Sequence, residues 1–335
     1  MDNLKKVGLS ALAGSLVAFS AATAGEMTVT GSAKFTYTAD TGNEDSDGEH
    51  FDNSRWGMNQ ALAATGSAEL DNGHTVTLMH AFSTNGGAKS TSVLTYDMGS
   101  MGTLRYQEDS GALGIGIIDD ITPTADEEVW NGLGTGATSG GDLVGRVSGG
   151  VTGFNYNISL DMVDVNIGYS PNSQSGSQAD GSNGTTGGLE SSKSVAISIT
   201  PMDGLRIVAG TGQKGNADGL KSDDHDTIGA TYAWGPVTVG YQHSEIDDGT
   251  TGTTKDTKQD MMSIAFAVND DLSISYGSQD TSRQGQSIDQ EVTGWSVGYS
   301  MGGITIKAHR NTAENINQTA NNESEHTEIA LTFAF

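Results

Sequence analysis

The last eight residues, Glu328-Ile-Ala-Leu-Thr-Phe-Ala-Phe335, decide the fold class of this chain. Their large apolar residues alternate with small or polar ones, and a period of two places all the large side chains on one face of an extended strand. A strand at the end of a chain has an open edge unless another strand pairs with it. We therefore expect this segment to pair with the first strand and to close an all-β barrel whose apolar face lies in lipid.

The composition fits a barrel with a wet interior. The 335 residues are 35% hydrophobic, include 47 glycines but only 4 prolines, and carry a formal net charge of -26. Low hydrophobicity and high charge are also typical of disordered chains, but the regular apolar alternation argues against disorder. A membrane barrel resolves the conflict, because it needs apolar residues only on its outer band.

The charge and the cysteine count exclude several function classes. Nucleic acid is a poor partner for an acidic chain without clustered lysine and arginine residues. The chain has no cysteine, which rules out disulfides, thiolate catalysis and cysteine-ligated metal sites.

Residues 1–24 have the features of a secretory signal peptide. Lys5 and Lys6 precede a short apolar stretch that ends in the small-residue cleavage site Ala22-Thr23-Ala24. The apolar stretch is too short to span a bilayer as a helix. We expect the mature chain to start near Gly25 and residues 25–335 to form one transmembrane barrel domain.

Alternation from Met27 onward predicts about sixteen antiparallel strands in an up-and-down barrel, an even number as such barrels require. The predicted segments are 27–38, 55–70, 74–82, 93–98, 103–108, 154–160, 164–169, 193–200, 205–213, 225–234, 237–246, 261–268, 272–280, 292–300, 304–311 and 325–335.

The connections between these strands alternate in length. One set has two to four residues, with turn sequences such as Asp203-Gly204, and the other has about eight to forty-five. Outer-membrane barrels have this asymmetry, with short periplasmic turns and long external loops. Soluble sandwiches and propellers have no reason to sort their loops in this way.

Aromatic residues of the outward parity lie where the predicted strands begin and end. Strand propensity alone would also favour aromatics, but they make up only 6% of the chain, so this concentration favours aromatic girdles at the two water–lipid boundaries. The residues are Tyr37, Trp56, Phe82, Tyr96, Tyr106, Tyr169, Trp234, Tyr241, Trp295, Tyr299 and Phe335.

Taken together, these features resemble the general diffusion porins of Gram-negative bacteria, most closely the sixteen-stranded porins of alphaproteobacterial type. The resemblance covers the whole mature chain and is carried by the signal, the long loop after the fifth strand, the terminal Phe335, and the segments Met27-Thr-Val-Thr-Gly-Ser-Ala-Lys-Phe35 and Glu69-Leu-Asp-Asn-Gly73.

The resemblance implies a homotrimer in the bacterial outer membrane, in contact with its lipid and lipopolysaccharide. It also implies a third loop folded into the lumen and passive diffusion of small hydrophilic solutes. The C-terminal aromatic residues, Phe333 and Phe335, would be read by the outer-membrane assembly machinery.

A sixteen-stranded barrel leaves a water-filled channel, and something must narrow it if it is to select by size. The stretch 109–153 is long enough and correctly placed to do so, and Leu113, Ile115, Ile117 and Ile118 could attach it to the inner wall. Its carboxylates Asp119, Asp120, Asp126, Glu127 and Glu128 are the candidate constriction residues. A solvated external loop is the alternative.

Basic residues of the inward parity could face these carboxylates across the channel and create a transverse field. The candidates are Lys34, Arg55, Arg105, Arg206 and Lys307. They are fewer than in porins with dense arginine clusters, so we expect carboxylates to dominate the potential and the channel to be mildly cation-selective.

We expect no required cofactor, and weak Ca²⁺ binding is the only ion binding that the sequence suggests. Asn43-Glu-Asp-Ser-Asp-Gly48 begins like a calcium loop, but Ser54 stands where such a loop has a bidentate glutamate. Weak binding by Asp119 or Asp120 is a second option that the family resemblance suggests. The scattered histidines have no metal-site spacing, so no other metal site is expected.

Three other functions compete with a general diffusion porin. A substrate-specific channel for a sugar, phosphate or peptide would need an aromatic or basic ladder, whereas the inward positions are mostly Ser, Thr, Gly, Ala and Asn. An outer-membrane enzyme would need a catalytic constellation that the spacing does not suggest. A secreted calcium-binding repeat protein would need a nonapeptide repeat.

Overall fold

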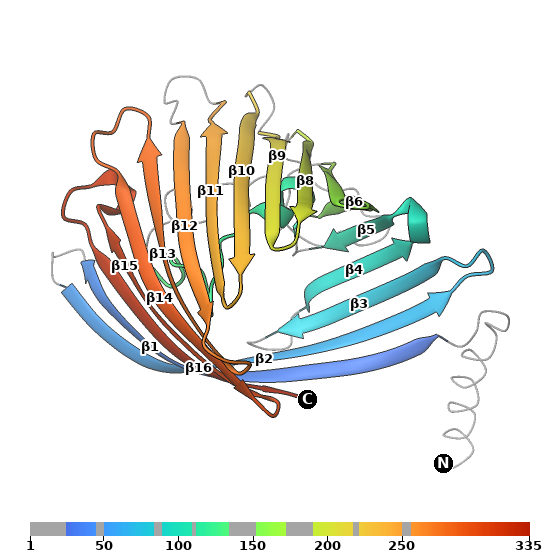
Figure 1. The fold of residues 1–335 in the computed structure, drawn as a ribbon, viewed down its shortest axis with the longest axis horizontal. Helices are drawn as coiled ribbons and strands as arrows, with labels where there is room; N and C mark the ends of the chain where they lie inside the picture. The colour runs from blue at the N-terminus through green and yellow to red at the C-terminus, as the bar shows by residue number, and fades with distance from the viewer. Residues whose placement is uncertain are drawn as a thin grey trace, which may run out of the picture.

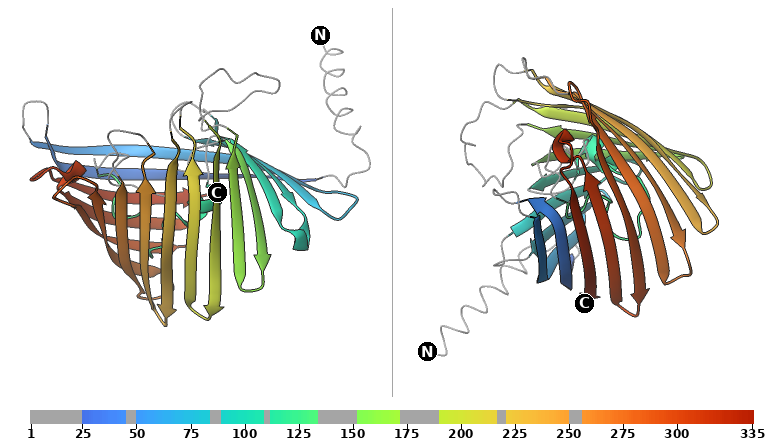
Figure 2. Two further views of the ribbon diagram at one scale, coloured as in Figure 1. Left: turned by 90° about the horizontal axis from the view of Figure 1, so that it is seen from above. Right: turned by 90° about the vertical axis from the view of Figure 1, so that its left-hand side faces the viewer.

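A computed structural model describes residues 25–44, 50–83, 89–108, 112–133, 152–171, 190–216, 221–249 and 256–335. In these ranges sixteen antiparallel strands form a closed barrel, in which each strand pairs with its sequence neighbours and β1 pairs with β16 (Figures 1 and 2). The predicted barrel architecture is confirmed. The predicted signal peptide, residues 1–24, lies outside the described residues.

The first eight strands are β1 (Glu26–Glu44), β2 (His50–Glu69), β3 (Thr75–Ser83), β4 (Lys89–Asp97), β5 (Thr103–Glu108), β6 (Gly153–Leu160), β7 (Val163–Ser170) and β8 (Ser192–Met202). The second eight are β9 (Leu205–Lys214), β10 (Asp223–Trp234), β11 (Val237–Asp247), β12 (Thr257–Ala267), β13 (Leu272–Arg283), β14 (Gln290–Met301), β15 (Ile304–Glu314) and β16 (Ser324–Ala334). Three short 3-10 helices are η1 (Gly99–Met101), η2 (Gly114–Ile118) and η4 (Ile316–Gln318). None of the helices in the described ranges is long and apolar enough to cross a membrane.

The terminal strands close the barrel in the expected way. The register of β1 against β16 runs from Ser32 opposite Ala334 to Thr41 opposite Glu325. Phe335 extends the ladder by one residue. Its backbone N–H donates to the Gly31 carbonyl at 2.9 Å, and the Gly31 N–H donates to the Phe335 carbonyl at 2.7 Å. This pairing removes the edge that the last strand would otherwise expose.

The apolar face of the sheet points outward along the whole circumference. Met27, Trp234 and Phe335 expose 73%, 75% and 78% of their surface. Residues of this kind recur on the same parity of neighbouring strands, for example Leu78, Ile228, Met262 and Ile329. So much exposed apolar surface is unfavourable in water and favourable in a bilayer, so this face is the lipid-facing one.

The strands are longer than predicted at the ends that carry the long loops. β1 continues to Glu44 instead of Thr38, and β12 begins at Thr257 instead of Met261. The predicted ends followed the apolar alternation, but backbone pairing continues past the lipid band, where outward residues such as Glu245 become charged. The expected loop asymmetry is consequently weaker at three hairpins, since β1–β2, β3–β4 and β13–β14 are joined by only 45–49, 84–88 and 284–289.

The aromatic pattern needs the same correction. Tyr241 and Trp295 lie in the middle of β11 and β14, not at strand ends. The strands extend beyond them with polar outward residues, so an aromatic residue at the outer lipid boundary does not mark the end of its strand. Trp234 does end β10, at the short-turn side of the barrel.

Candidate functional site

The connection between β5 and β6 folds inside the barrel. Its described part, residues 112–133, is here called the internal loop; it begins with η2 and runs along the inner face of the sheet (Figure 1). All the wall residues that bond to it have the inward parity, opposite to the apolar lipid face. An external position for this loop, the alternative left open by the sequence, is therefore wrong.

The first turn of the internal loop is fixed by hydrogen bonds to inward side chains. The Gly114 N–H donates to Asn155 Oδ1 on β6 at 2.8 Å, and the Ile115 N–H donates to Ser194 Oγ on β8 at 3.1 Å. Apolar packing adds to these bonds, because the buried residues Ile115, Ile118 and Ile121 of the loop form a cluster with Ala196 and Val208 of the wall. The expected attachment through loop isoleucines is thus present for Ile115 and Ile118.

Gln242 on β11 is the central anchor of the loop. It is fully buried, its Oε1 accepts from the Ile121 N–H at 2.9 Å, and its Nε2 donates to the carbonyls of Ile118 and Asp119 at 2.8 and 3.0 Å. One amide side chain therefore satisfies three backbone groups that would otherwise be buried without a partner.

Beyond this anchor, small polar side chains of successive strands hold the loop backbone. Ser263 on β12 donates to the Pro123 carbonyl at 2.7 Å. The Ala125 N–H donates to Ser275 Oγ on β13 at 3.0 Å. Asn311 on β15 donates to the carbonyls of Glu128 and Asn131 at 3.2 and 3.0 Å.

The far end of the loop packs against a second apolar cluster. Leu133 is buried with Val292, Ala313 and Ile316, and Val129 and Trp130 pack on this group. The described loop is thus attached from β6 round to β15, across more than half of the barrel wall.

Asp126 is held by two basic side chains of β15. Its carboxylate contacts Lys307 Nζ at 3.2 Å and His309 Nδ1 at 2.7 Å, and its own side chain is only 3% exposed. Burial alone would raise the pKa of Asp126, but the bond from His309 and the charge of Lys307 outweigh it and lower that pKa. Asp126 consequently stays ionised and ties the loop to the wall.

The other loop carboxylates fall into two groups. Glu127 lies 4.0 Å from Lys34, whose ammonium also contacts Glu328 at 2.6 Å. Asp119, Asp120 and Glu128 have no ion pair with a lysine or arginine in the described part of the chain. The internal loop therefore carries uncompensated negative charge.

Burial changes the protonation of two of these unpaired acids. It raises the pKa of Asp120 to about 6, against the opposing effect of hydrogen bonds from the Thr122 hydroxyl and N–H. Burial likewise raises the pKa of Glu128, and the neighbouring carboxylates add to that rise. The charge of the loop thus depends on pH near neutrality.

The candidate basic residues do not all face the loop across an opening, as the transverse-field hypothesis required. Lys307 and Lys34 contact Asp126 and Glu127 directly. Arg105 donates to the Ala112 carbonyl at 2.8 Å, where the loop begins, and Arg206 donates to Ser198 Oγ at 2.9 Å on the same wall. Arg55 contacts Asp40 at 3.5 Å and keeps 70% of its side chain exposed.

The described residues show no cluster that supports the calcium hypothesis. In these ranges, no three histidine, aspartate or glutamate side chains converge in an arrangement suited to a metal ion. The segment 45–49 of the possible calcium loop lies outside the described residues.

Sequence reasoning missed the residues that hold the loop. The sequence predicted inward polar side chains at Gln242, Ser263 and Asn311. The same pattern is expected of residues that line a water-filled channel. Side-chain length does not separate the two uses, because Ser263 is no longer than the inward threonines of β1 and β3 and still bonds to the Pro123 carbonyl, 140 positions away in the chain.

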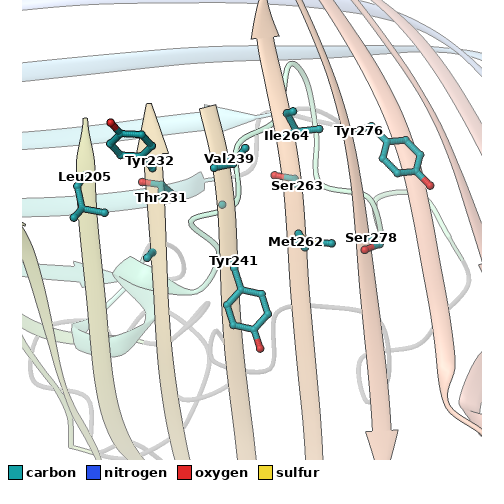
Figure 3. A pocket seen from close by; sticks show the side chains of 12 residues that line it. Leu205, Thr231, Tyr232, Val239, Tyr241, Met262, Ser263, Ile264, Tyr276 and Ser278 are labelled. Atoms are coloured by element: carbon teal, nitrogen blue, oxygen red, sulfur yellow. The ribbon is translucent and has the colours of Figure 1, made fainter. Parts of the chain in front are cut away.

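A hollow of about 410 Å³ lies on the other side of the sheet, over β9–β13 (Figure 3). Tyrosines 232, 241 and 276 surround it, and its surface is mainly apolar. Since these side chains have the outward parity, the hollow belongs to the lipid face and not to the solute path.

The described ranges therefore define a closed transmembrane barrel with an acidic loop folded against its inner wall, which is the class of outer-membrane channels. A sequence model of the Gram-negative porin family matches residues 8–300, and the chain belongs to that family. The protein is accordingly an outer-membrane channel of Gram-negative bacteria. No curated protein matches the chain at a significant level.

Several solved porin structures share this fold at low sequence identity. An anion-selective porin from Comamonas acidovorans is 14% identical, with a TM-score of 0.68 over 93% of this chain and 100% of the other. OmpT of Vibrio cholerae is 12% identical, with a TM-score of 0.65 over 93% and 98%. A mutant of the Rh. blastica porin is 12% identical, with a TM-score of 0.63 over 92% and 100%.

Proposed function

We propose that this barrel allows passive diffusion of small hydrophilic solutes and ions, with a modest preference for cations. The observation that carries the preference is the charge of the internal loop: Asp126 and Glu127 are matched by Lys307 and Lys34, whereas the loop's remaining acids are not. Unmatched carboxylates attract cations and repel anions in a narrow aqueous passage.

The test is the reversal potential of the purified protein in planar bilayers across a KCl gradient. A cation-selective potential is expected, and its reduction in an Asp119→Asn/Asp120→Asn variant would assign it to the loop. A potential of the anion-selective sign would overturn the proposal. Current that saturates with one sugar, phosphate or peptide would instead establish a substrate-specific channel.

We further propose that the protein assembles as a homotrimer. One solved structure of V. cholerae OmpT, which is 10% identical to this chain, is described as the trimer form. Light scattering of the detergent-solubilised protein should give three times the mass of one chain, and a monomer mass would overturn the proposal.

Phe333 and Phe335 are proposed as the signal for the assembly machinery, with lipid and lipopolysaccharide as the surroundings of the folded barrel. Phe335 is exposed and its backbone bonds with Gly31, so its ring is available while its backbone closes the barrel. Phe335→Ala should keep the backbone bonds and lower the amount of barrel in the outer membrane. Weak Ca²⁺ binding by Asp119 or Asp120 remains a prediction, which calorimetry can test.

A further inference from the structure

The inner wall beneath the internal loop contains a glycine on six strands. The residues are Gly168 (β7), Gly210 (β9), Gly229 (β10), Gly240 (β11), Gly277 (β13) and Gly298 (β14), all of the inward parity. We propose that these six glycines, here called the glycine seat, set how far the internal loop stands from the wall and thereby determine the aperture of the channel.

Backbone conformation does not explain these glycines. None of the six has a positive φ, whereas the turn residues Gly73 and Gly204 do. Glycine inside a strand is unfavourable, because it costs conformational entropy and contributes no side chain to packing. The remaining reason for a strand glycine is the close approach of another part of the chain.

The internal loop makes that close approach. A β-carbon on Gly240 would lie 2.5 Å from Pro123 Cδ and 3.1 Å from Thr122 Cα. On Gly298 it would lie 2.6 Å from the Ala125 carbonyl oxygen, and on Gly168 it would lie 2.7 Å from the Gly114 backbone nitrogen. These are ring or backbone atoms of the loop, which cannot rotate away, so the loop itself would have to move.

At three other positions the loop presents side chains instead. A β-carbon on Gly210 would lie 2.7 Å from Ile115 Cγ1, and one on Gly277 would lie 3.0 Å from Val129 Cγ1. One on Gly229 would lie 2.9 Å from Ile121 Cδ1 and 2.9 Å from the Tyr241 carbonyl oxygen of the neighbouring strand. The three loop residues are among those that build the two apolar clusters of the loop. The glycine seat thus receives the same side chains that attach the loop to the wall.

The direction of the effect follows from the parity. An inward β-carbon points to the lumen, so it pushes the loop away from the wall that bears it. The loop carries Asp119, Asp120 and Glu128, and its displacement would bring these carboxylates toward the opposite wall. Each glycine of the seat therefore keeps the passage wide, and a methyl group there narrows it.

The inference rests on the proposed channel function, and Gly240→Ala is its principal test. In planar bilayers its single-channel conductance should fall on the order of 1.5-fold, because a close-packed contact cannot absorb an added methyl group without moving. Gly298→Ala should act in the same direction. The matched control is Gly57→Ala: this glycine also faces inward on a strand, but its β-carbon would meet only Thr36 Oγ1.

A second pair of variants separates aperture from misfolding. Gly277→Ala should also lower the conductance, and adding Val129→Ala should restore it, since alanine lacks the Cγ1 atom that is the nearest atom to the new methyl group. Rescue by a smaller loop residue is not expected of a barrel that simply folds poorly.

A distance measurement tests the seat without relying on current. The chain has no cysteine, so spin labels can be placed at Thr124→Cys on the loop and at Thr77→Cys, an inward position of β3 on the part of the wall that the described loop does not contact. Their separation should shorten in Gly240→Ala and remain unchanged in Gly57→Ala. Unchanged distance and conductance in Gly240→Ala would overturn the seat, whereas a wild-type protein that does not conduct would overturn the channel function alone.

Discussion

Two parts of the same barrel wall have the same strand pattern and opposite surroundings. The inner face of β6–β15, the loop-bearing wall, is covered by the internal loop, and its inward residues Ser263, Ser296 and Asn311 are buried. The inner face of β2–β4, the bare wall, forms no bond with the described part of the loop, and its inward residues Asn59 and Ala61 are exposed.

This difference teaches that inward polar residues have two distinct uses in one barrel. On the bare wall they face water, and their identity matters little beyond being hydrophilic. On the loop-bearing wall they replace water as partners of a second backbone, and their length and size decide where that backbone lies. In the proposed channel, solutes pass between the acidic internal loop and the bare wall.

The largest effect should come from removing the loop from its wall altogether. Replacing residues 119–131 by a short glycine linker should raise the single-channel conductance several-fold, since a barrel of sixteen strands leaves a wide aqueous lumen when nothing narrows it. Cation preference should fall in the same variant. An unchanged conductance would show that the loop does not narrow the channel.

Gln242→Leu should have the next largest effect. It leaves three loop backbone groups without a partner, each at a cost of about 1–3 kcal/mol, so the loop should leave the wall part of the time and the current should become noisy. Thr77→Val makes a similar polar-to-apolar change on the bare wall and should leave the current steady. Equal noise in both variants would contradict the distinction between the two walls.

Asp126→Asn should have an intermediate effect. It removes the ion pair with Lys307 and weakens the bond from His309, at a cost of about 1.5–3 kcal/mol, which is typical of hydrogen bonds to charged groups. The uncompensated Lys307 charge should also shift the reversal potential toward anions. A reversal potential identical to that of the wild type would show that this pair lies away from the ion path.

Acidification should change selectivity before it changes loop position. Asp120 has a raised pKa of about 6, so it loses its charge as the pH falls from 7 to 5, and cation preference should decline over that range. Asp126 has a lowered pKa, so its contribution to holding the loop is complete at neutral pH and is lost only below about pH 4. Conductance should therefore stay constant between pH 7 and 5, and Asp120→Asn should remove much of the selectivity change.

The smallest effect is expected on the bare wall. Arg55 is largely exposed and its contact with Asp40 is long, so Arg55→Gln should change stability by less than about 1 kcal/mol and the reversal potential only slightly. Thermal unfolding in detergent and bilayer recordings provide the two measurements. A large loss of anion current would mean that Arg55 contributes more to the electrostatic potential of the channel than its exposed position indicates.

The alternation of apolar residues was enough to predict the strands, but not where each strand ends. β5 was predicted with its observed bounds, because Glu108 is followed directly by the long connection. β1 was predicted to end six residues too early, because its pairing with β2 continues where the outward residues cease to be apolar. Apolar alternation marks only the part of a strand that lies in the lipid, whereas backbone hydrogen bonding sets the full length of the strand.

The sequence indicated the kind of residues that the internal loop carries, but not their arrangement. The acids of 109–153 were identified because a wide barrel requires a narrowing element. The contact of Asp126 with Lys307 was not, because the two residues are 181 positions apart in the chain and only barrel closure and loop folding bring them together. The same reason hid Gln242 and the glycine seat, whose sequences look like ordinary channel lining.

The sequence by itself determined a barrel with its apolar side outward, joined through its two ends, because side-chain parity and the need to pair every strand edge are local properties of each strand. Only the tertiary structure decided which wall carries the loop, which acids are matched by cations, and how far the loop stands from the sheet. Those outcomes depend on contacts between strands and a loop distant in the chain, and such contacts leave no periodic trace in the sequence.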